Sequence, residues 1–185
     1  MSRFYDACLQ EVYDRGSPPE SFLDELVDWA TQAPSDLFVE NNRNDIYSSV
    51  YEELGPWHGL NHRKAVMLEV LRVLGGFESS WNWNEGVDIS NPKSKTPCTE
   101  EAGIFQCSGD SMNYGDNLKS MLARVAPDTT CESFIKTTKS NHRFAIEYCA
   151  QLLRLTTKHH GPIKFKEIHP YLRTDAVNEF LLFIL

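Results

Sequence analysis

Residues 62–74 are apolar around most of their circumference when they are drawn as a helix. The apolar members are Ala65, Val66, Met67, Leu68, Val70, Leu71, Val73 and Leu74. Such a helix has no polar face to turn toward water, so it belongs inside the molecule. We therefore expect it to be the central buried helix, with Asn61 as its N-terminal cap and Gly75-Gly76 as an interruption at its end.

Other segments repeat apolar residues at helical spacing and should pack around this helix. They are residues 4–16, 17–33, 46–54, 117–125, 140–155 and 175–185. Residues 79–114 have a different composition, rich in Asn, Ser, Gly and Pro. They should form loops with at most a small β-hairpin. The sequence therefore predicts a mostly α fold of the α+β class, with one loop-rich insertion.

Size and charge narrow the range of functions. The 185 residues fit one domain, 1–185, and no apolar run approaches the roughly 18 residues that cross a bilayer. The net charge of −8 argues against a nucleic-acid binder. Residues 1–60 carry twelve acids and three bases, whereas residues 136–173 carry eight Lys or Arg and two acids. Either these two ends pack against each other, or one of them attracts a charged partner.

The five cysteines match no zinc-site spacing and include no CxxC pair. Cys98 and Cys107 share one loop-like stretch and could form a disulfide in an oxidising compartment, with Cys131 and Cys149 as a second candidate pair. Free buried cysteines are the alternative. The sequence does not decide between them.

His159-His160 is the one histidine pair in the chain. Neighbouring histidines point in different directions on a helix, so the pattern favours a helix end with favourable dipole contacts over a metal site. We expect no metal and no cofactor.

Glu78 is the strongest candidate for a catalytic residue. It follows the predicted buried helix and lies between Phe77 and Trp81. Desolvation there should raise the pKa of its carboxyl group. A general acid needs that shift, because a fully ionised glutamate has no proton to give. A second carboxylate across a cleft, with Glu101 as one candidate, would complete the pair used in glycoside hydrolysis.

Two short segments resemble a known family. Phe77-Glu78-Ser79-Ser80-Trp81-Asn82 resembles the Glu-Ser-x-aromatic-Asn segment that carries the catalytic acid in the lysozyme-like superfamily. Glu101-Ala102-Gly103-Ile104-Phe105-Gln106 is similar to the acidic-x-Gly-Ile/Leu-apolar-Gln segment that follows it. The superfamily includes chicken-type and goose-type lysozymes and soluble lytic transglycosylases. The resemblance implies a lysozyme-like fold, in which the buried helix and a small β-hairpin region form the active-site cleft.

The resemblance also implies an activity and its residues. A muramidase cleaves the β-1,4 bond between N-acetylmuramic acid and N-acetylglucosamine in peptidoglycan. Glu78 matches the catalytic acid, and Glu101 matches the second carboxylate of the chicken-type pattern, where that family has Asp. Asn82 and Gln106 match positions near the sugar subsites. Trp81 offers a flat apolar face on which a sugar could stack.

The second catalytic group is left open by the resemblance. Goose-type enzymes place their water-orienting aspartates differently, so Asp88, Glu85 or Asp110 is a candidate for that role. Lytic transglycosylases use no second catalytic carboxylate, which makes a transglycosylase giving 1,6-anhydro products the alternative activity. A non-catalytic glycan-binding module of the same fold is a further alternative.

The cellular context follows from the same resemblance. The chain begins without a secretory signal, although peptidoglycan lies outside the cytoplasm. Leaderless cell-wall hydrolases that a type VI secretion machine delivers to the periplasm of a target bacterium look similar. Such antibacterial toxins need an immunity protein that occludes the cleft. The domain then comprises an acidic helical part (1–60), the catalytic helix and cleft (62–125) and a basic helical part (136–185).

Overall fold

The structure, a computed structural model, describes residues 3–86 and 94–185. It is mostly helical with one two-stranded antiparallel sheet, which confirms the predicted mostly α class. The helices are α1 (Glu20–Gln32), α2 (Ile46–Ser49), α3 (Tyr51–Leu54), α4 (Leu60–Ser79), α5 (Asp116–Ala123), α6 (Cys131–Ser140), α7 (His142–Leu155), α8 (Gly161–Lys164) and α9 (Thr174–Ile184). Short 3-10 helices are η1 (Ala7–Leu9), η2 (Ser35–Leu37), η3 (Gly109–Tyr114) and η4 (His169–Tyr171), and the strands are β1 (Glu101–Ala102) and β2 (Cys107–Ser108).

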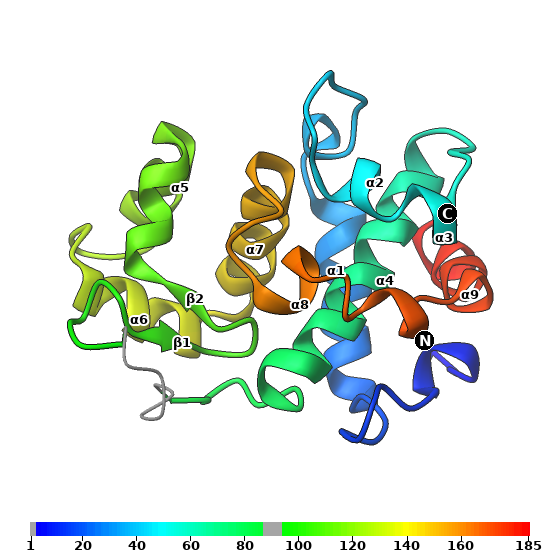
Figure 1. The fold of residues 1–185 in the computed structure, drawn as a ribbon, viewed down its shortest axis with the longest axis horizontal. Coiled ribbons are helices and arrows are strands. Elements are labelled where there is room, and N and C mark those ends of the chain that lie inside the picture. The colour runs from blue at the N-terminus through cyan, green and yellow to red at the C-terminus, as the bar shows by residue number, and fades with distance from the viewer. Residues whose placement is uncertain (1–2, 87–93) are drawn as a thin grey trace.

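The elements form two groups joined by a middle layer. Helices α1, α4 and α9 pack together at one end, and both chain ends lie there (Figure 1). Helices α5 and α6 and the β1–β2 hairpin gather at the other end, with α7 and α8 between the two groups (Figure 1). The end of α4 lies beside the hairpin, so the predicted catalytic segment falls where the two groups meet.

Helix α4 is the central buried helix, as the sequence predicts, but it is longer at both ends. It begins at Leu60, after Gly59 rather than after the predicted cap Asn61. It also continues through Gly75-Gly76 to Ser79, so the predicted interruption is wrong. The two glycines instead make room for the ring of Trp81, because a Cβ on Gly76 would lie 2.8 Å from that ring.

Two charged residues of α4, Glu69 and Arg72, have no exposed surface. The Nε and Nη2 atoms of Arg72 donate to the two carboxylate oxygens of Glu69 at 2.7 and 2.8 Å. Arg72 also donates to the backbone carbonyl of Gln10 at 3.1 Å, and Glu69 accepts the backbone N–H of Arg173 at 2.9 Å. The pair thus ties α4 to the segments that precede α1 and α9. In the part of the chain that the structure describes, no helix is both long and apolar enough to cross a membrane.

Residues 4–16 do not form the predicted helix. Only Ala7–Leu9 is helical, as a 3-10 turn, and Tyr13 adopts a left-handed φ of 52° that a continuous α-helix does not allow. The segment is held by α9 instead, where the carboxylate of Glu179 accepts its backbone N–H groups, including that of Cys8 at 2.8 Å. A tertiary contact therefore replaces the helical hydrogen bonds.

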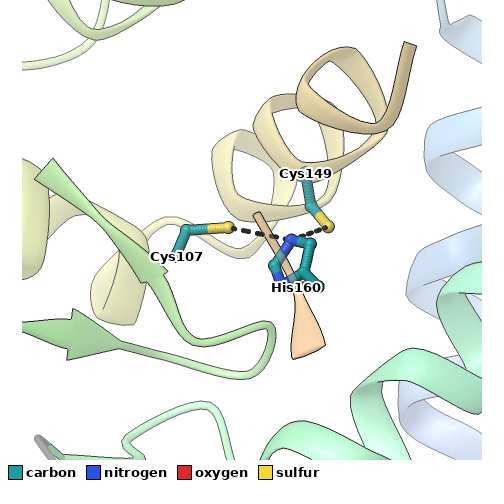
Figure 2. Close-up of side chains that lie close together, drawn as sticks. All are labelled: Cys107, Cys149 and His160. Atoms are coloured by element: carbon teal, nitrogen blue, oxygen red, sulfur yellow. Dashed lines mark hydrogen bonds between the residues drawn. The ribbon is translucent and has the colours of Figure 1, made fainter. Parts of the chain in front are cut away.

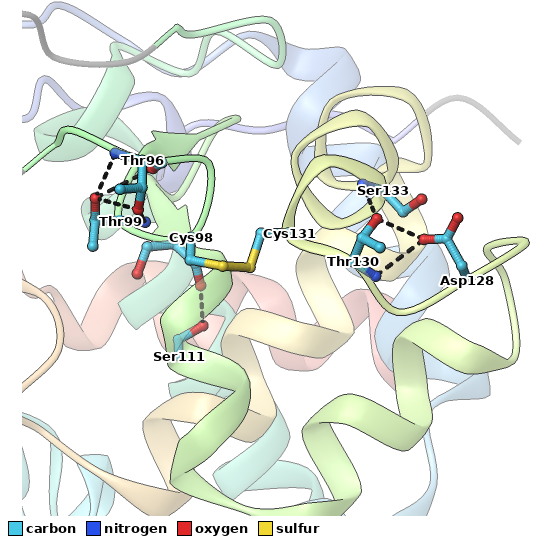
Figure 3. The surroundings of a disulfide bond; sticks show 9 residues. Thr96, Cys98, Thr99, Ser111, Asp128, Thr130, Cys131 and Ser133 are labelled. Carbon is cyan, nitrogen blue, oxygen red and sulfur yellow. Dashed lines mark hydrogen bonds between the residues drawn. A yellow bond between two sulfur atoms is a disulfide. The ribbon is translucent and has the colours of Figure 1, made fainter.

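A disulfide joins Cys98 to Cys131, the first residue of α6 (Figure 3). The predicted pairs, Cys98 with Cys107 and Cys131 with Cys149, are both wrong, because Cys107 and Cys149 are free and buried. Closing the intervening loop stabilises the fold by roughly 4 kcal/mol in the chain-entropy model. It also fastens the first residue of α6, a helix that the sparse apolar pattern of residues 131–140 does not predict.

The acidic and basic parts of the chain pack against each other. Residues of the basic part reach carboxylates of the acidic part at 2.7 Å (His142–Glu25), 2.8 Å (Arg154–Asp45) and 2.6 Å (His169–Glu53). These contacts confirm the intramolecular interpretation of the charge polarity. Arg154 contributes a guanidinium group to these contacts, and the other two are made by histidines.

Replacing Gly76 by alanine should destabilise the protein by about 1–3 kcal/mol in denaturant unfolding. Overpacking outweighs the roughly 1 kcal/mol by which alanine favours a helix. The Trp81 ring cannot easily give way, because its Nε1 donates to the carbonyl of Arg72 at 2.9 Å. Gly86→Ala is the control, since nothing lies within 4 Å of the added methyl. Equal or greater stability of Gly76→Ala would contradict this packing.

The Asp128 carboxylate should stay ionised to unusually low pH. Hydrogen bonding by Ser133 first, and then by Thr130, lowers the pKa of Asp128 to about 2. Figure 3 shows the two bonds from Thr130 to this carboxylate. Because this value lies below the ordinary one, the stabilising contribution is present above about pH 4 and is lost as the pH falls toward 2. An NMR titration of this carboxyl carbon measures it, and Thr130→Val should raise the midpoint. A midpoint at the ordinary value in the wild type would contradict the contacts.

Candidate functional site

Glu78 lies in the last turn of α4 and faces the segment before α8. Its Oε1 atom is 3.1 Å from Nδ1 of His160, whose side chain is buried. The Glu78 side chain itself keeps 16% of its surface exposed. The carboxyl group therefore rests on a buried imidazole on one side and reaches the surface on the other.

The chain reverses direction immediately after Glu78. Ser80 and Trp81 both adopt left-handed φ values, 53° and 59°. This turn folds the Trp81 ring back onto Gly75-Gly76, where it is 5% exposed. The ring offers almost no free surface in this position, and the predicted substrate contact of Trp81 stays a prediction. The ring packs the end of α4.

The predicted β-hairpin is present and contacts the end of α4. Ser79 donates through Oγ to the carbonyl of Ile104 at 2.8 Å, which fixes the tip of the hairpin on the helix. Gln106 is buried in that tip and donates through Nε2 to the carbonyl of Gly103 at 2.9 Å. Its amide closes the turn, and the predicted sugar contact of Gln106 stays a prediction.

Glu101 lies on β1 and pairs with Ser108, while Ala102 pairs with Cys107. Successive side chains of a strand point to opposite faces. Cys107 points toward His160, so Glu101 leaves the hairpin on the other face. The register does not direct Glu101 toward the Glu78–His160 pair, and its role as the second carboxylate stays a prediction.

The other sequence candidates are not brought into the Glu78–His160 contact by any interaction seen among the described residues. Asn82 is exposed and donates through Nδ2 to Glu85 at 3.0 Å. Asp110 is exposed in η3. Asp88 lies outside the described residues. The substrate-binding and water-orienting roles of these residues stay predictions.

Two cysteines meet His160 on the side away from Glu78. The Nε2 atom of His160 is 3.9 Å from Sγ of Cys107 in β2 and 3.8 Å from Sγ of Cys149 in α7 (Figure 2). All three residues are buried, and we call them the Cys–Cys–His cluster. The predicted helix end at His159-His160 is wrong, because α7 stops at Leu155 and His160 directly precedes α8.

The pKa values of the Cys–Cys–His cluster indicate that it carries both a negative and a positive charge in the interior. Burial lowers the pKa of His160, but hydrogen bonds to Cys107 and Glu78 outweigh it and raise the pKa to about 10. The contact with Cys149 lowers the pKa of Cys107, burial raises it and His160 lowers it again, for a net value of about 6. Burial raises the pKa of Cys149 well above its ordinary value. At neutral pH these shifts favour one thiolate, one thiol and one imidazolium.

Cys107, His160 and Glu78 follow the order of a thiol nucleophile, its base and an orienting carboxylate. Cys107 is only 2% exposed, so a substrate carbonyl cannot reach its sulfur in this arrangement. Sequence reasoning missed the cluster because Cys107, Cys149 and His160 share no short spacing. The only local signal was the His159-His160-Gly161-Pro162 segment.

Comparisons with known proteins identify no relative of this chain. No protein-family model, curated protein or solved structure matches this chain at a significant level. The resemblance of residues 77–82 and 101–106 to the lysozyme-like superfamily is therefore carried by those short segments alone.

Replacing Ser79 by alanine should cost about 1–3 kcal/mol in unfolding free energy, because the Ile104 carbonyl would lose its buried donor. The Ser79 hydroxyl also accepts the backbone N–H of Asn82 at 3.1 Å, so the turn after Glu78 should loosen too. Denaturant unfolding measures the loss. Ser17→Ala at an exposed position is the control and should change stability by less than about 0.5 kcal/mol. Equal behaviour of the two variants would argue against this tether.

Proposed function

We propose that this protein is a peptidoglycan glycoside hydrolase, a muramidase of the lysozyme-like fold. The observation that carries the proposal is the setting of Glu78. Its carboxyl group ends a buried helix, is 16% exposed and lies 3.1 Å from Nδ1 of His160, with which it shares a proton. The contact between Ser79 and Ile104 holds a β-hairpin beside it. A carboxyl group fixed in this way between the interior and the surface suits general acid catalysis.

In this mechanism Glu78 donates a proton to the oxygen of the β-1,4 bond between N-acetylmuramic acid and N-acetylglucosamine. The bond to the anomeric carbon breaks, positive charge develops on the sugar ring, and a water molecule adds while its proton returns to the enzyme. Nδ1 of His160 faces Oε1 of Glu78 at 3.1 Å, so this pair holds a proton beside the reacting carboxyl group. His160 therefore orients Glu78 and shares its proton.

One observation favours a lytic transglycosylase as the second candidate function. The strand register turns Glu101 to the face opposite Cys107, away from the Glu78–His160 pair. A site that lacks a second carboxylate opposite Glu78 lacks the group that usually positions the attacking water. The C6 hydroxyl of the muramic acid would attack the anomeric carbon instead, and its proton would pass to Glu78 while a 1,6-anhydro ring forms.

The biological setting belongs to the same proposal and rests on the resemblance of residues 77–82 and 101–106. The protein would act as an antibacterial effector on peptidoglycan in the periplasm of a target bacterium. Its partners would be the glycan strand and an immunity protein that occludes the cleft in related cells. Nucleic acid has no place in this function.

Glu78→Gln should reduce the release of soluble muropeptides from purified sacculi by at least about 100-fold, the usual contribution of a general acid. Glu25→Gln is a matched control, because Glu25 also faces a histidine nitrogen, that of His142 at 2.7 Å. It should keep wild-type activity. Unchanged release by Glu78→Gln would remove Glu78 from the mechanism.

Mass spectrometry of the products separates the two candidate functions. A hydrolase yields reducing ends, and one that uses Glu101 as the second carboxylate should lose most of its activity in Glu101→Gln. A transglycosylase yields 1,6-anhydro ends and should tolerate that change. Binding to sacculi without any product from the wild type would indicate the third alternative, a non-catalytic glycan-binding module.

A further inference from the structure

We propose that the Cys–Cys–His cluster binds a zinc ion through Sγ of Cys107, Sγ of Cys149 and Nε2 of His160. The three atoms lie within 4.8 Å of one another, and all three residues are buried. The inference does not rest on the glycosidase function, since it uses only the geometry of these donors. It assigns a role to two free cysteines that the proposed chemistry leaves without one.

The distance from the histidine nitrogen to each sulfur fits a tetrahedral ion with little movement. Zn–S bonds of about 2.3 Å and Zn–N bonds of about 2.0–2.1 Å place sulfur and nitrogen ligands about 3.6 Å apart. The observed separations from Nε2 are 3.9 Å to Cys107 and 3.8 Å to Cys149. When the ion binds, Cys149 Sγ and His160 Nε2 release their protons to solvent, and Cys107 binds as the thiolate. Side-chain shifts of a few tenths of an ångström bring these pairs to binding distance.

The outer partner of the histidine is also in place. A metal-binding histidine usually donates its second ring N–H to a carboxylate or a carbonyl, which fixes the tautomer and the ring orientation. Nδ1 of His160 is 3.1 Å from Oε1 of Glu78, so Nε2 is left to face the two sulfurs (Figure 2). The imidazole is thus held as a metal ligand would be.

The chemistry of the donors selects the class of ion. Two thiolates and one imidazole suit zinc and exclude the hard, oxygen-seeking Mg²⁺ and Ca²⁺. Three protein ligands leave a fourth tetrahedral position for a water molecule. Because the donors come from β2, α7 and the residue before α8, the bound ion would fasten the hairpin to the middle layer directly behind Glu78.

A disulfide between Cys107 and Cys149 is the competing fate of the same sulfurs. It would consume both thiolates and leave His160 without a ligand role. Cys98 and Cys131 are bonded in the structure while Cys107 and Cys149 remain thiols on either side of the imidazole nitrogen. That arrangement favours the ion.

The test uses the full-length chain, reduced, unfolded and refolded with Co²⁺ as a spectroscopic substitute for zinc. We expect one ion per chain, a sulfur-to-cobalt charge-transfer band and the intense visible bands of tetrahedral cobalt. Cys107→Ser and Cys149→Ser should weaken binding by more than the roughly 10–100-fold that an outer-shell change costs, and Glu78→Gln should fall within that range. Cys8→Ser, and Cys98→Ser combined with Cys131→Ser, remove the other sulfurs and should keep the spectrum.

Either of two results would overturn the proposal. One is a wild-type chain that refolds, as judged by circular dichroism, but shows no sulfur-to-cobalt band. The other is a band that persists in Cys149→Ser. If peptide mapping finds Cys107 bonded to Cys149, and reduced protein takes up no Co²⁺, the disulfide is the correct assignment. Because every readout is metal binding, a failed zinc site and a failed glycosidase are distinguishable.

Discussion

The ion pair of Glu69 and Arg72 holds the centre of this molecule in place. A charged side chain on a fully buried helix cannot reach water. It must therefore be paired with an opposite charge inside the protein. Arg72 meets Glu69 in bidentate geometry, and its own carbonyl accepts the indole N–H of Trp81. The same residue therefore secures the core and the turn that follows Glu78. The candidate catalytic carboxyl group owes its position to a contact two turns earlier in the helix.

Much of the fold was predictable because it depends on local periodicity. Apolar spacing located α1, α7, α9 and the centre of α4, and a change in composition located the hairpin. The failures arose where tertiary contacts override local preference. Gly75-Gly76 continues the helix because an aromatic ring covers it, and residues 4–16 are held by Glu179 rather than by helical bonds. Sequence patterns alone do not contain those contacts.

The residues of the candidate site also fall into those that local sequence predicts and those that only tertiary contacts reveal. The place of Glu78 at the end of the buried helix was predictable from local periodicity, whereas its contact with His160, 82 residues away in sequence, was not. Trp81 and Gln106 were assigned to the substrate from the same motif, yet both turn inward to build the scaffold around Glu78. The Cys–Cys–His cluster draws on β2, α7 and the residue before α8, and only the completed fold brings these three segments together. Long-range juxtaposition of this kind leaves no spacing to recognise.

The cross-link between Cys98 and Cys131 makes the rigidity of this molecule depend on its surroundings. Reducing conditions keep such cysteines as free thiols, whereas an oxidising environment joins them in a disulfide. A newly made chain in a reducing cell would thus have α6 anchored by packing and by its Thr130 cap alone. If the protein passes into an oxidising space, the bond closes after the passage. The reduced chain would be easier to unfold than the disulfide-bonded chain. The protein would therefore become more rigid once it reaches the oxidising space.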